Sequence, residues 1–201
     1  RNAVDVGFVY FAADLFNNKI ERLKRISEAE GPIFTFAHFE PPHSPYVFDQ
    51  EGNVLSVSSV LGSYSDKQAY IDQLIWVNKS IGGAVNYILR NNKKSSVIVI
   101  QGDHGTEITD TRKVVAYGGD PDDTLIHERS SILNVYHLPE MCKTGNLYKS
   151  ISSVNTFRLI FDSCWGTEFG LLEDESYWSS YDRLYDFTPI EEVVRYTGEP
   201  G

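Results

Sequence analysis

Two adjacent residues, Asp103 and His104, have the side chains in this sequence that are best suited to bind one metal ion. They follow the apolar run 97–100 and lie between Gly102 and Gly105. Neighbouring side chains on a regular strand point to opposite faces, so both can face one ion only where the chain turns. A glycine on each side favours that turn. A carboxylate oxygen and an imidazole nitrogen suit Zn²⁺ or Mn²⁺. In the alternative interpretation, the two side chains cap the next element.

Two histidines form a second candidate group. His38 lies at the end of the apolar run 33–39, and His43 lies in the loop that follows, among the three prolines of positions 41–45. Prolines cannot continue a central strand, and they hold a loop in a rigid, extended form. A histidine between prolines has lost freedom before a ligand arrives, which favours binding. The alternative for each histidine is a hydrogen bond to the backbone.

The composition narrows the class of protein. The chain has 201 residues, enough for one domain or most of one, and 41% of them are hydrophobic, as in an ordinary globular protein. Its net charge of −10 has the wrong sign for a nucleic-acid binder. No apolar run approaches the roughly 18 residues that a membrane span needs, so we expect no span in this chain. The chain starts at Arg1, as in a processed protein or a piece of a longer one.

The hydrophobic pattern predicts an α/β fold. The run 97–100 holds four consecutive β-branched residues, which suits a strand covered on both faces, as in a parallel sheet. The run 33–39 is predicted as an earlier strand, and the periodic stretch 65–91 as a long helix. Strand, helix and strand then form a βαβ unit, whose crossover is almost always right-handed.

The predicted long helix has two further features. Its start is placed either at a capping box of Ser65 and Gln68 or at Asp66. Gly82 and Gly83 lie inside the helix, where each glycine costs about 1 kcal/mol relative to alanine. We expect a close approach of this helix to the sheet to offset that cost.

The rest of the chain is predicted more coarsely. Residues 4–16 suit a strand or the start of a helix, 132–137 suit a strand, and 154–161 suit a short helix with its aromatic rings partly buried. The polar stretch up to residue 125 is predicted as a solvated loop. The aromatic rings from residue 173 onward are expected to lie against the body of the protein.

The chain has two cysteines, Cys142 and Cys164. They can form one bridge if the protein is exported, but isolated buried cysteines are also common. The spacing alone leaves their pairing open.

Several short motifs, taken in their order along the chain, resemble those of one known family. Residues 36–45 look like a strand followed by a Pro-His-x-Pro loop. Residues 77–82, on the long helix, and residues 97–105 are similar to a helix, strand and Asp-His-Gly turn. Residues 153–158 look like a late helix, and Ser176-Tyr177-Trp178-Ser179 looks like the tail of one bacterial membrane-anchored subgroup. Together they resemble the sulfatase-like branch of the alkaline phosphatase superfamily.

This resemblance, from about residue 20 to about residue 190, implies a fold and a chemistry. The fold is a three-layer α/β/α sandwich, alkaline phosphatase-like, with residues 1–201 as the carboxyl-terminal portion of one domain that is incomplete at its N-terminal side. The chemistry is metal-assisted attack on phosphate or sulfate esters, as in sulfatases, phosphoethanolamine transferases and lipoteichoic acid synthases. Membrane-anchored relatives act on lipid or cell-envelope headgroups, so the parent protein is expected on the extracytoplasmic side of the membrane.

The resemblance also implies roles for the candidate residues. Asp103 and His104 are expected as ligands of a divalent metal ion, with Zn²⁺ or Mn²⁺ favoured over Ca²⁺. His43 is expected to contact the anionic group of the substrate or the leaving oxygen, and His38 to lie near the same pocket.

The sequence departs from this family in one respect. The family's nucleophile, a Thr, Ser or modified Cys, and a second acidic metal ligand lie in its amino-terminal half, and neither is found here. We therefore expect this chain alone to be catalytically silent. A sheet without its early strands exposes an edge, so we also expect a tendency to form homo-oligomers.

Several alternatives stay open from the sequence. The chain is interpreted as a portion of an enzyme acting on an anionic ester, as a non-catalytic sulfatase-like binding or scaffold domain, or as an unrelated α/β domain whose Asp-His turn is structural. These residues do not distinguish a phosphate ester from a sulfate ester as the substrate. Hydrolase and transferase are not separated either, because they share a covalent intermediate and differ in what attacks it.

Overall fold

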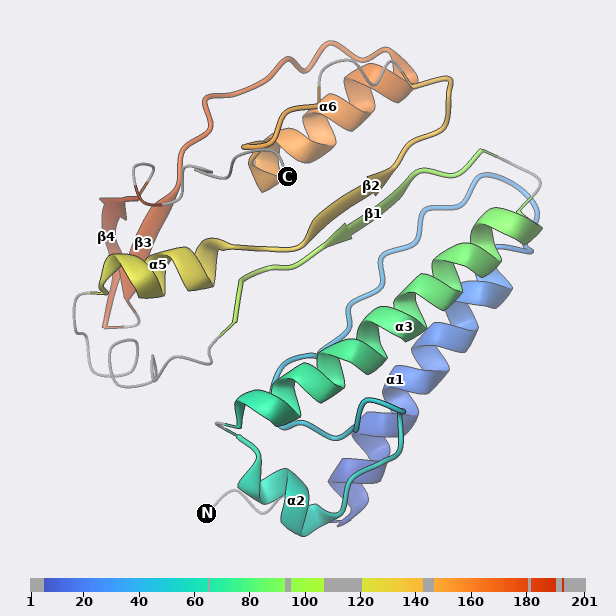
Figure 1. Ribbon diagram of the computed structural model, residues 1–201. Coiled ribbons are helices and arrows are strands. Elements are labelled where there is room, and N and C mark those ends of the chain that lie inside the picture. Colours follow the sequence, from blue (N-terminus) through green and yellow to red (C-terminus); the bar gives the residue numbers. More distant parts are fainter. Residues whose placement is uncertain are drawn as a thin grey trace. The chain divides into compact units, whose positions relative to one another are not determined.

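The computed structural model describes residues 6–64, 66–92, 95–106, 121–142, 147–180, 182–190 and 193 (Figure 1). The chain divides into two compact units, Arg1–Lys94 and Ser95–Gly201. Among the described residues, no helix is both long enough and apolar enough to cross a bilayer.

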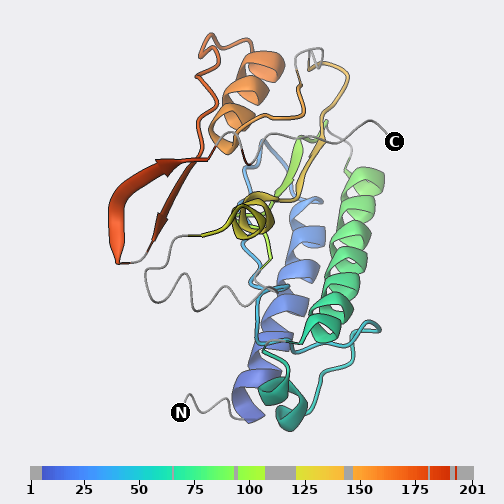
Figure 2. The same ribbon diagram turned by 60° about the vertical axis from the view of Figure 1, so that its left-hand side comes forward.

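The first unit is built on two long helices that lie side by side, α1 (Val6–Ile26) and α3 (Lys67–Asn91) (Figures 1 and 2). The short helix α2 (Val57–Gly62) packs against α1. Apolar residues recur along α1 every three or four positions, which gives the helix one buried stripe. The buried core of the unit consists of Val9, Ala13, Phe16, Ile20, Val47, Phe48, Val60, Val77 and Ala84. Of the two predictions for residues 4–16, the helix is confirmed from residue 6.

Helix α3 confirms the predicted long helix. Its N-cap is Asp66, whose Oδ1 accepts hydrogen bonds from the backbone N–H groups of Gln68 (2.8 Å) and Ala69 (3.3 Å). These bonds satisfy two of the donors that the first turn of a helix leaves without partners. Ser65 lies outside the described residues, so the capping box stays a prediction.

Two kinds of glycine occur in the first unit. A Cβ placed on Gly82 or Gly83 would meet no described atom within 4 Å. The close approach of this helix to a sheet stays a prediction, because all the named strands belong to the second unit. Gly52, in contrast, has a φ of +91°, and a Cβ there would lie within 2.5 Å of the Trp76 ring. Both its backbone conformation and its neighbour require a glycine at position 52.

Replacing Gly83 by alanine is expected to stabilise the first unit by about 1 kcal/mol, because alanine is the better helix former and its methyl group meets open space. Gly52→Ala is the matched opposite and is expected to lower the free energy of unfolding. Urea unfolding of both variants, followed by circular dichroism, measures these changes. A Gly83→Ala variant less stable than the wild type would contradict the open surroundings of that position.

The predicted strand over residues 33–39 is wrong for the described structure. This segment contains no strand, and Phe34 and Phe36 are 87% and 83% exposed. A strand needs a neighbour that pairs with its N–H and C=O groups, and no described segment pairs with this one. The expected βαβ unit is therefore not formed by the described residues.

The second unit holds two small antiparallel sheets. Strand β1 (Ile98–Gln101) pairs with β2 (Asn134–His137), and β3 (Tyr177–Ser180) pairs with β4 (Arg183–Pro189). The strands predicted over 97–100 and 132–137 are thus confirmed. However, β1 is only partly buried, and its described neighbour is antiparallel instead of parallel. The three-layer α/β/α sandwich stays a prediction, because the described strands form no larger sheet.

Helix α5 (Asp123–Ser130) begins within the stretch that the sequence predicts as a solvated loop. Asp122 is its N-cap, and the Asp122 side chain accepts a hydrogen bond from the backbone N–H of Leu125 at 2.8 Å. The loop prediction is therefore wrong from residue 123 onward. Residues 107–120 lie outside the described part of the chain.

Aromatic rings that the sequence predicts as covered are exposed in the second unit. On α6 (Ser153–Trp165), Leu159 and Ile160 take the buried face, and Phe157 and Phe161 are exposed. Of the rings of the tail, Tyr177, Tyr185 and Phe187 are exposed, Tyr185 at 90%, whereas Trp178 is partly buried. Tyr181 lies outside the described residues. Every residue of β4 is exposed, because little of the described chain packs on this strand.

Helix α6 confirms the predicted late helix and also holds the segment that follows it. The buried side chain of Asn155 donates from Nδ2 to the carbonyl of Leu172 and accepts at Oδ1 from the Leu172 N–H, both at 2.9 Å. The carboxylate of Asp162 accepts the backbone N–H groups of Phe169 (2.8 Å) and Gly170 (2.9 Å). A hydrogen bond from Thr167 contributes most to holding the pKa of Asp162 below its usual range. Segment 166–172 is thus fixed to α6 by side chains.

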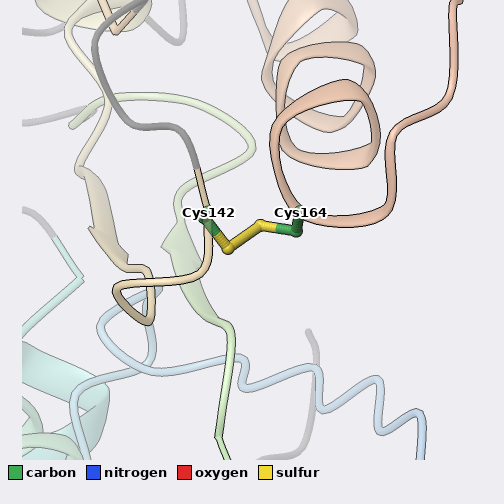
Figure 3. Close-up of a disulfide and its surroundings, with 2 residues drawn as sticks. All are labelled: Cys142 and Cys164. Carbon is green, nitrogen blue, oxygen red and sulfur yellow. A yellow bond between two sulfur atoms is a disulfide. The ribbon is translucent and has the colours of Figure 1, made fainter.

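A disulfide joins Cys142, which follows β2, to Cys164 near the end of α6 (Figure 3). The two sulfur atoms are 2.09 Å apart, and the two Cα atoms are 4.1 Å apart. Cys142, Cys164 and Ile160 form a buried cluster. Side chains from β1, β2 and their flanks pack against it: Val97, Val99, Tyr136 and Leu138. The bridge therefore connects α6 to the small sheet, and the pairing that the sequence leaves open is formed.

The double variant Cys142→Ser/Cys164→Ser is expected to lose about 3 kcal/mol of unfolding free energy, because the bridge closes a loop with a sequence separation of 22 residues. Urea unfolding of the variant and of the oxidised wild type measures the loss. Wild-type protein treated with a reductant is the control and is expected to show the same loss. Equal stability of the oxidised and reduced wild type would contradict the bridge.

Candidate functional site

The turn after β1 is fixed by backbone hydrogen bonds on both sides of the two candidate metal ligands. The N–H of Gly102 donates to the carbonyl of Leu133 at 2.9 Å, and the N–H of Gly105 donates to the carbonyl of Arg129 at 2.6 Å. The chain leaves the strand at this point, as the paired glycines predict. The turn therefore lies against the segment that leads from the end of α5 into β2.

Asp103 and His104 lie side by side in this turn. The Asp103 side chain is 84% exposed, and its Oδ2 lies 3.9 Å from Nε2 of His104. Nδ1 of the same imidazole lies 2.7 Å from the carbonyl oxygen of Gly105. A metal-binding histidine almost always donates its second ring N–H to such an acceptor, which fixes the tautomer. In the tautomer that donates from Nδ1 to Gly105, Nε2 of His104 is the nitrogen that can bind a metal ion. In the other tautomer, Nδ1 accepts from Nη1 of Arg129 at 3.1 Å and Nε2 carries the proton.

The distance between the two side chains fits shared metal binding after a small rotation. Two ligand atoms of a tetrahedral Zn²⁺ lie about 3.4 Å apart, against the 3.9 Å between Asp103 Oδ2 and His104 Nε2. The capping alternative is not tested, because residues 107–120, which follow the turn, lie outside the described part of the chain. The donor set, one carboxylate and one imidazole, fits Zn²⁺ or Mn²⁺. Within the described residues, no group of three or more His, Cys, Asp or Glu side chains is placed to hold an ion.

Arg129 is a member of this site that the sequence prediction missed. Its Nη1 lies 3.1 Å from Nδ1 of His104, and it lies in the last turn of α5. In the same turn of the helix, the Glu128 carboxylate accepts a hydrogen bond from the hydroxyl of Thr106. A guanidinium group keeps its positive charge at all physiological pH values and binds phosphate or sulfate oxygens through a planar fork. The helix that presents it begins in a stretch predicted as a loop and continues through residues for which no element is predicted, so no sequence signal pointed to this residue.

His38 and His43 lie in the first unit, while the Asp103 turn belongs to the second. Both histidines are exposed. Nδ1 of His43 lies 2.5 Å from the carbonyl oxygen of Ser44, so the ring bonds within its own loop, as the alternative interpretation expects. A contact between His43 and a substrate would therefore fall to Nε2. The role of His38 near a shared pocket stays a prediction.

The loop of His43 is held by one buried amide and one cation. Nε2 of the buried Gln73 donates to the carbonyl of His43 at 3.2 Å. Nζ of Lys19 donates to the carbonyl of His38 at 2.8 Å and lies 3.1 Å from Oε2 of Glu40. A backbone hydrogen bond at Glu40, opposed by burial and aided by the Lys19 ammonium, holds the pKa of the Glu40 carboxyl below its usual range. Both histidines therefore lie in a segment fixed to α1 and α3.

Comparison with known proteins identifies no relative. No family model, no curated protein and no solved structure matches this chain. The resemblance to the sulfatase-like branch therefore stays a prediction from the sequence motifs.

Gly105→Ala is expected to disrupt the turn, because a Cβ at this position would overlap the carbonyl oxygen of Glu128. Gly102→Ala is the matched control, since its Cβ would meet ordinary contacts, the nearest at 3.5 Å. Two-dimensional NMR spectra of both variants, compared at the signals of His104 and Arg129, measure the change. Equal spectral changes in the two variants would contradict the tight packing of Gly105 against α5.

Proposed function

We propose that this chain is part of a metal-dependent hydrolase or transferase that acts on phosphate or sulfate esters of cell-envelope or lipid headgroups. The observation that carries the proposal is the pair of ligand atoms at the carboxyl end of β1, Asp103 Oδ2 and His104 Nε2, 3.9 Å apart. The contact of His104 Nδ1 with the carbonyl of Gly105 is compatible with the proposal, because in the tautomer that donates to Gly105 the Nε2 atom can bind metal.

Each residue of the turn has a distinct part in the proposed chemistry. A divalent ion, when bound, neutralises charge on the ester and lowers the pKa of an attacking oxygen. Asp103 and His104 hold that ion. Arg129, with Nη1 3.1 Å from the His104 ring, supplies a fixed positive charge for the oxygens of the ester. This local charge offsets the net charge of −10 of the whole chain, which otherwise repels an anionic substrate.

His43 is proposed as the residue that contacts the anionic group or the leaving oxygen. Its loop is fixed by hydrogen bonds from Gln73 and Lys19, which limits the entropy that binding would cost. We assign no nucleophile to this chain, and we propose that a complete site also needs a nucleophile and a second acidic ligand.

The disulfide supports a place outside the cytoplasm. A bond between Cys142 and Cys164 persists in oxidising compartments and is rare in the cytosol. Such a compartment is where an enzyme acting on cell-envelope or outer-leaflet headgroups would meet its substrate.

Calorimetric titration of the chain with Zn²⁺ and Mn²⁺ tests the metal site. Asp103→Ala and His104→Ala are each expected to weaken metal binding by about tenfold or more, because each removes a ligand. His127→Ala is the matched control, since His127 is an exposed histidine of the same unit outside the turn, and it is expected to leave binding unchanged. Metal binding that survives both ligand substitutions, or that falls equally in His127→Ala, would place the ion elsewhere.

A second titration, with inorganic phosphate and sulfate in the presence of metal, tests Arg129. Arg129→Ala is expected to leave metal binding intact and to weaken anion binding by about tenfold, the effect of one lost hydrogen bond to a charged group. Unchanged anion binding in this variant would remove Arg129 from the proposed site. Metal binding without any anion binding would favour the non-catalytic binding or scaffold domain.

A further inference from the structure

The β3–β4 ribbon presents its side chains in an unusual way. Trp178 pairs with Thr188 and Tyr177 with Pro189, so alternate residues along each strand share a face. The outer face carries the exposed aromatic rings of Tyr177, Tyr185 and Phe187. The other face carries Trp178, Leu184 and the polar side chains of Asp186 and Thr188, and Ser180 pairs with Arg183 beyond a register shift. The β4 residues of this face are also exposed.

Part of that face lines a cavity of about 140 Å³. Trp178, Ser180, Asp186 and Thr188 contribute to its wall from the ribbon, together with Arg183. Pro121 and Ile126, at the start of α5 and within it, form the apolar part of the wall. A cavity of about this volume is known to hold one six-membered ring. The size therefore suits a single ring.

Arg183, in the cavity wall, lies beside two carboxylates, of which Asp186 also lines the cavity and Asp182 does not. Nη1 of Arg183 lies 3.4 Å from Oδ2 of Asp186, and Nε of Arg183 lies 3.9 Å from Oδ2 of Asp182. The hydroxyl of Ser180 donates to Asp182 at 2.6 Å, and this bond contributes most to holding the pKa of the Asp182 carboxyl below its usual range. The ligand would thus meet a cation, a carboxylate and hydroxyl groups within one small space.

Trp178 adds an aromatic surface and a hydrogen-bond donor. Its Nε1 is buried and has no acceptor among the described residues. A buried N–H without a partner is costly, so a ligand oxygen that reached it would satisfy this donor. The indole ring also offers a flat apolar surface to a ligand that has an apolar side.

These features favour one of four simple ligand classes. The carboxylate of Asp186 disfavours an anion, and the guanidinium of Arg183 disfavours a cation. A purely apolar ring would leave the Nε1 donor of Trp178 without an acceptor. A neutral ring with several hydroxyl groups remains, because hydroxyl groups both donate to carboxylates and accept from guanidinium and indole N–H groups.

We propose that the cavity between the β3–β4 ribbon and α5 binds a single sugar ring, with its C–H face on Trp178 and its hydroxyl groups on Arg183, Asp186 and Thr188. This site is separate from the Asp103 turn and does not rest on the proposed function. It gives the chain a second binding function, the recognition of a neutral saccharide unit.

Ligand-observed NMR and calorimetry with the methyl glycosides of glucose, galactose, mannose and N-acetylglucosamine test the site. At least one glycoside is expected to bind saturably, and Asp186→Asn and Arg183→Gln are each expected to weaken that binding by about tenfold, the effect of one lost hydrogen bond to a charged group. Tyr185→Ser is the matched control on the outer face, where Tyr185 is exposed, and is expected to bind as the wild type does. Circular dichroism establishes that each variant is folded.

The proposal is overturned if none of the four glycosides binds, or if Asp186→Asn and Arg183→Gln are folded and bind as tightly as the wild type. Inorganic phosphate serves as a second probe in the same titration. Phosphate that binds and displaces the glycoside would assign the cavity to anions instead of sugars. Metal titration of the same variants separates the two proposals, because a failed sugar site leaves Zn²⁺ binding at Asp103 and His104 unchanged.

Discussion

The N–H of Gly105 donates to the carbonyl of Arg129 in a space that leaves no room for a side chain, and the whole candidate site depends on this contact. The last carbonyls of a helix have no partner within the helix, so the end of α5 offers an acceptor that the turn can use. The same contact brings the guanidinium of Arg129 beside His104. One backbone bond therefore fixes the turn, orients a possible metal ligand and places a cation next to it.

The loop of His43 is also held by hydrogen bonds to backbone groups, which in this case come from the side chain of Gln73. Gln73 is fully buried, and its amide serves three backbone partners: Oε1 accepts from Val47 (2.8 Å) and Phe48 (3.3 Å), and Nε2 donates to His43. A buried polar side chain is stable only when its hydrogen bonds are made. The extended segment beside α3 thus receives from one side chain the bonds that a neighbouring strand would otherwise supply.

The sequence predicts those features that repeat or that need glycine. Helices α3 and α6 follow from their hydrophobic spacing, and the turn at Asp103 follows from its two glycines. The run 33–39 is as apolar as the segments that do form strands, but its composition does not say whether another strand is present to pair with it. Helix α5 has only Leu125 and Ile126 buried among charged residues, too few to produce a period, and Arg129 was missed with it. The pairing of Cys142 with Cys164 depends on tertiary contacts that spacing does not contain.

The segment after α6 shows how a stretch without regular structure can share the stability of a helix. Asn155 and Asp162 hold its backbone through Phe169, Gly170 and Leu172, and these bonds exist only while α6 is formed. Opening the segment alone would remove both hydrogen bonds between the buried amide of Asn155 and Leu172, so it is disfavoured. Helix and segment therefore form one cooperative unit, and local fluctuations that release the one release the other. The part of the chain that opens together with α6 therefore extends past the last residue of the helix.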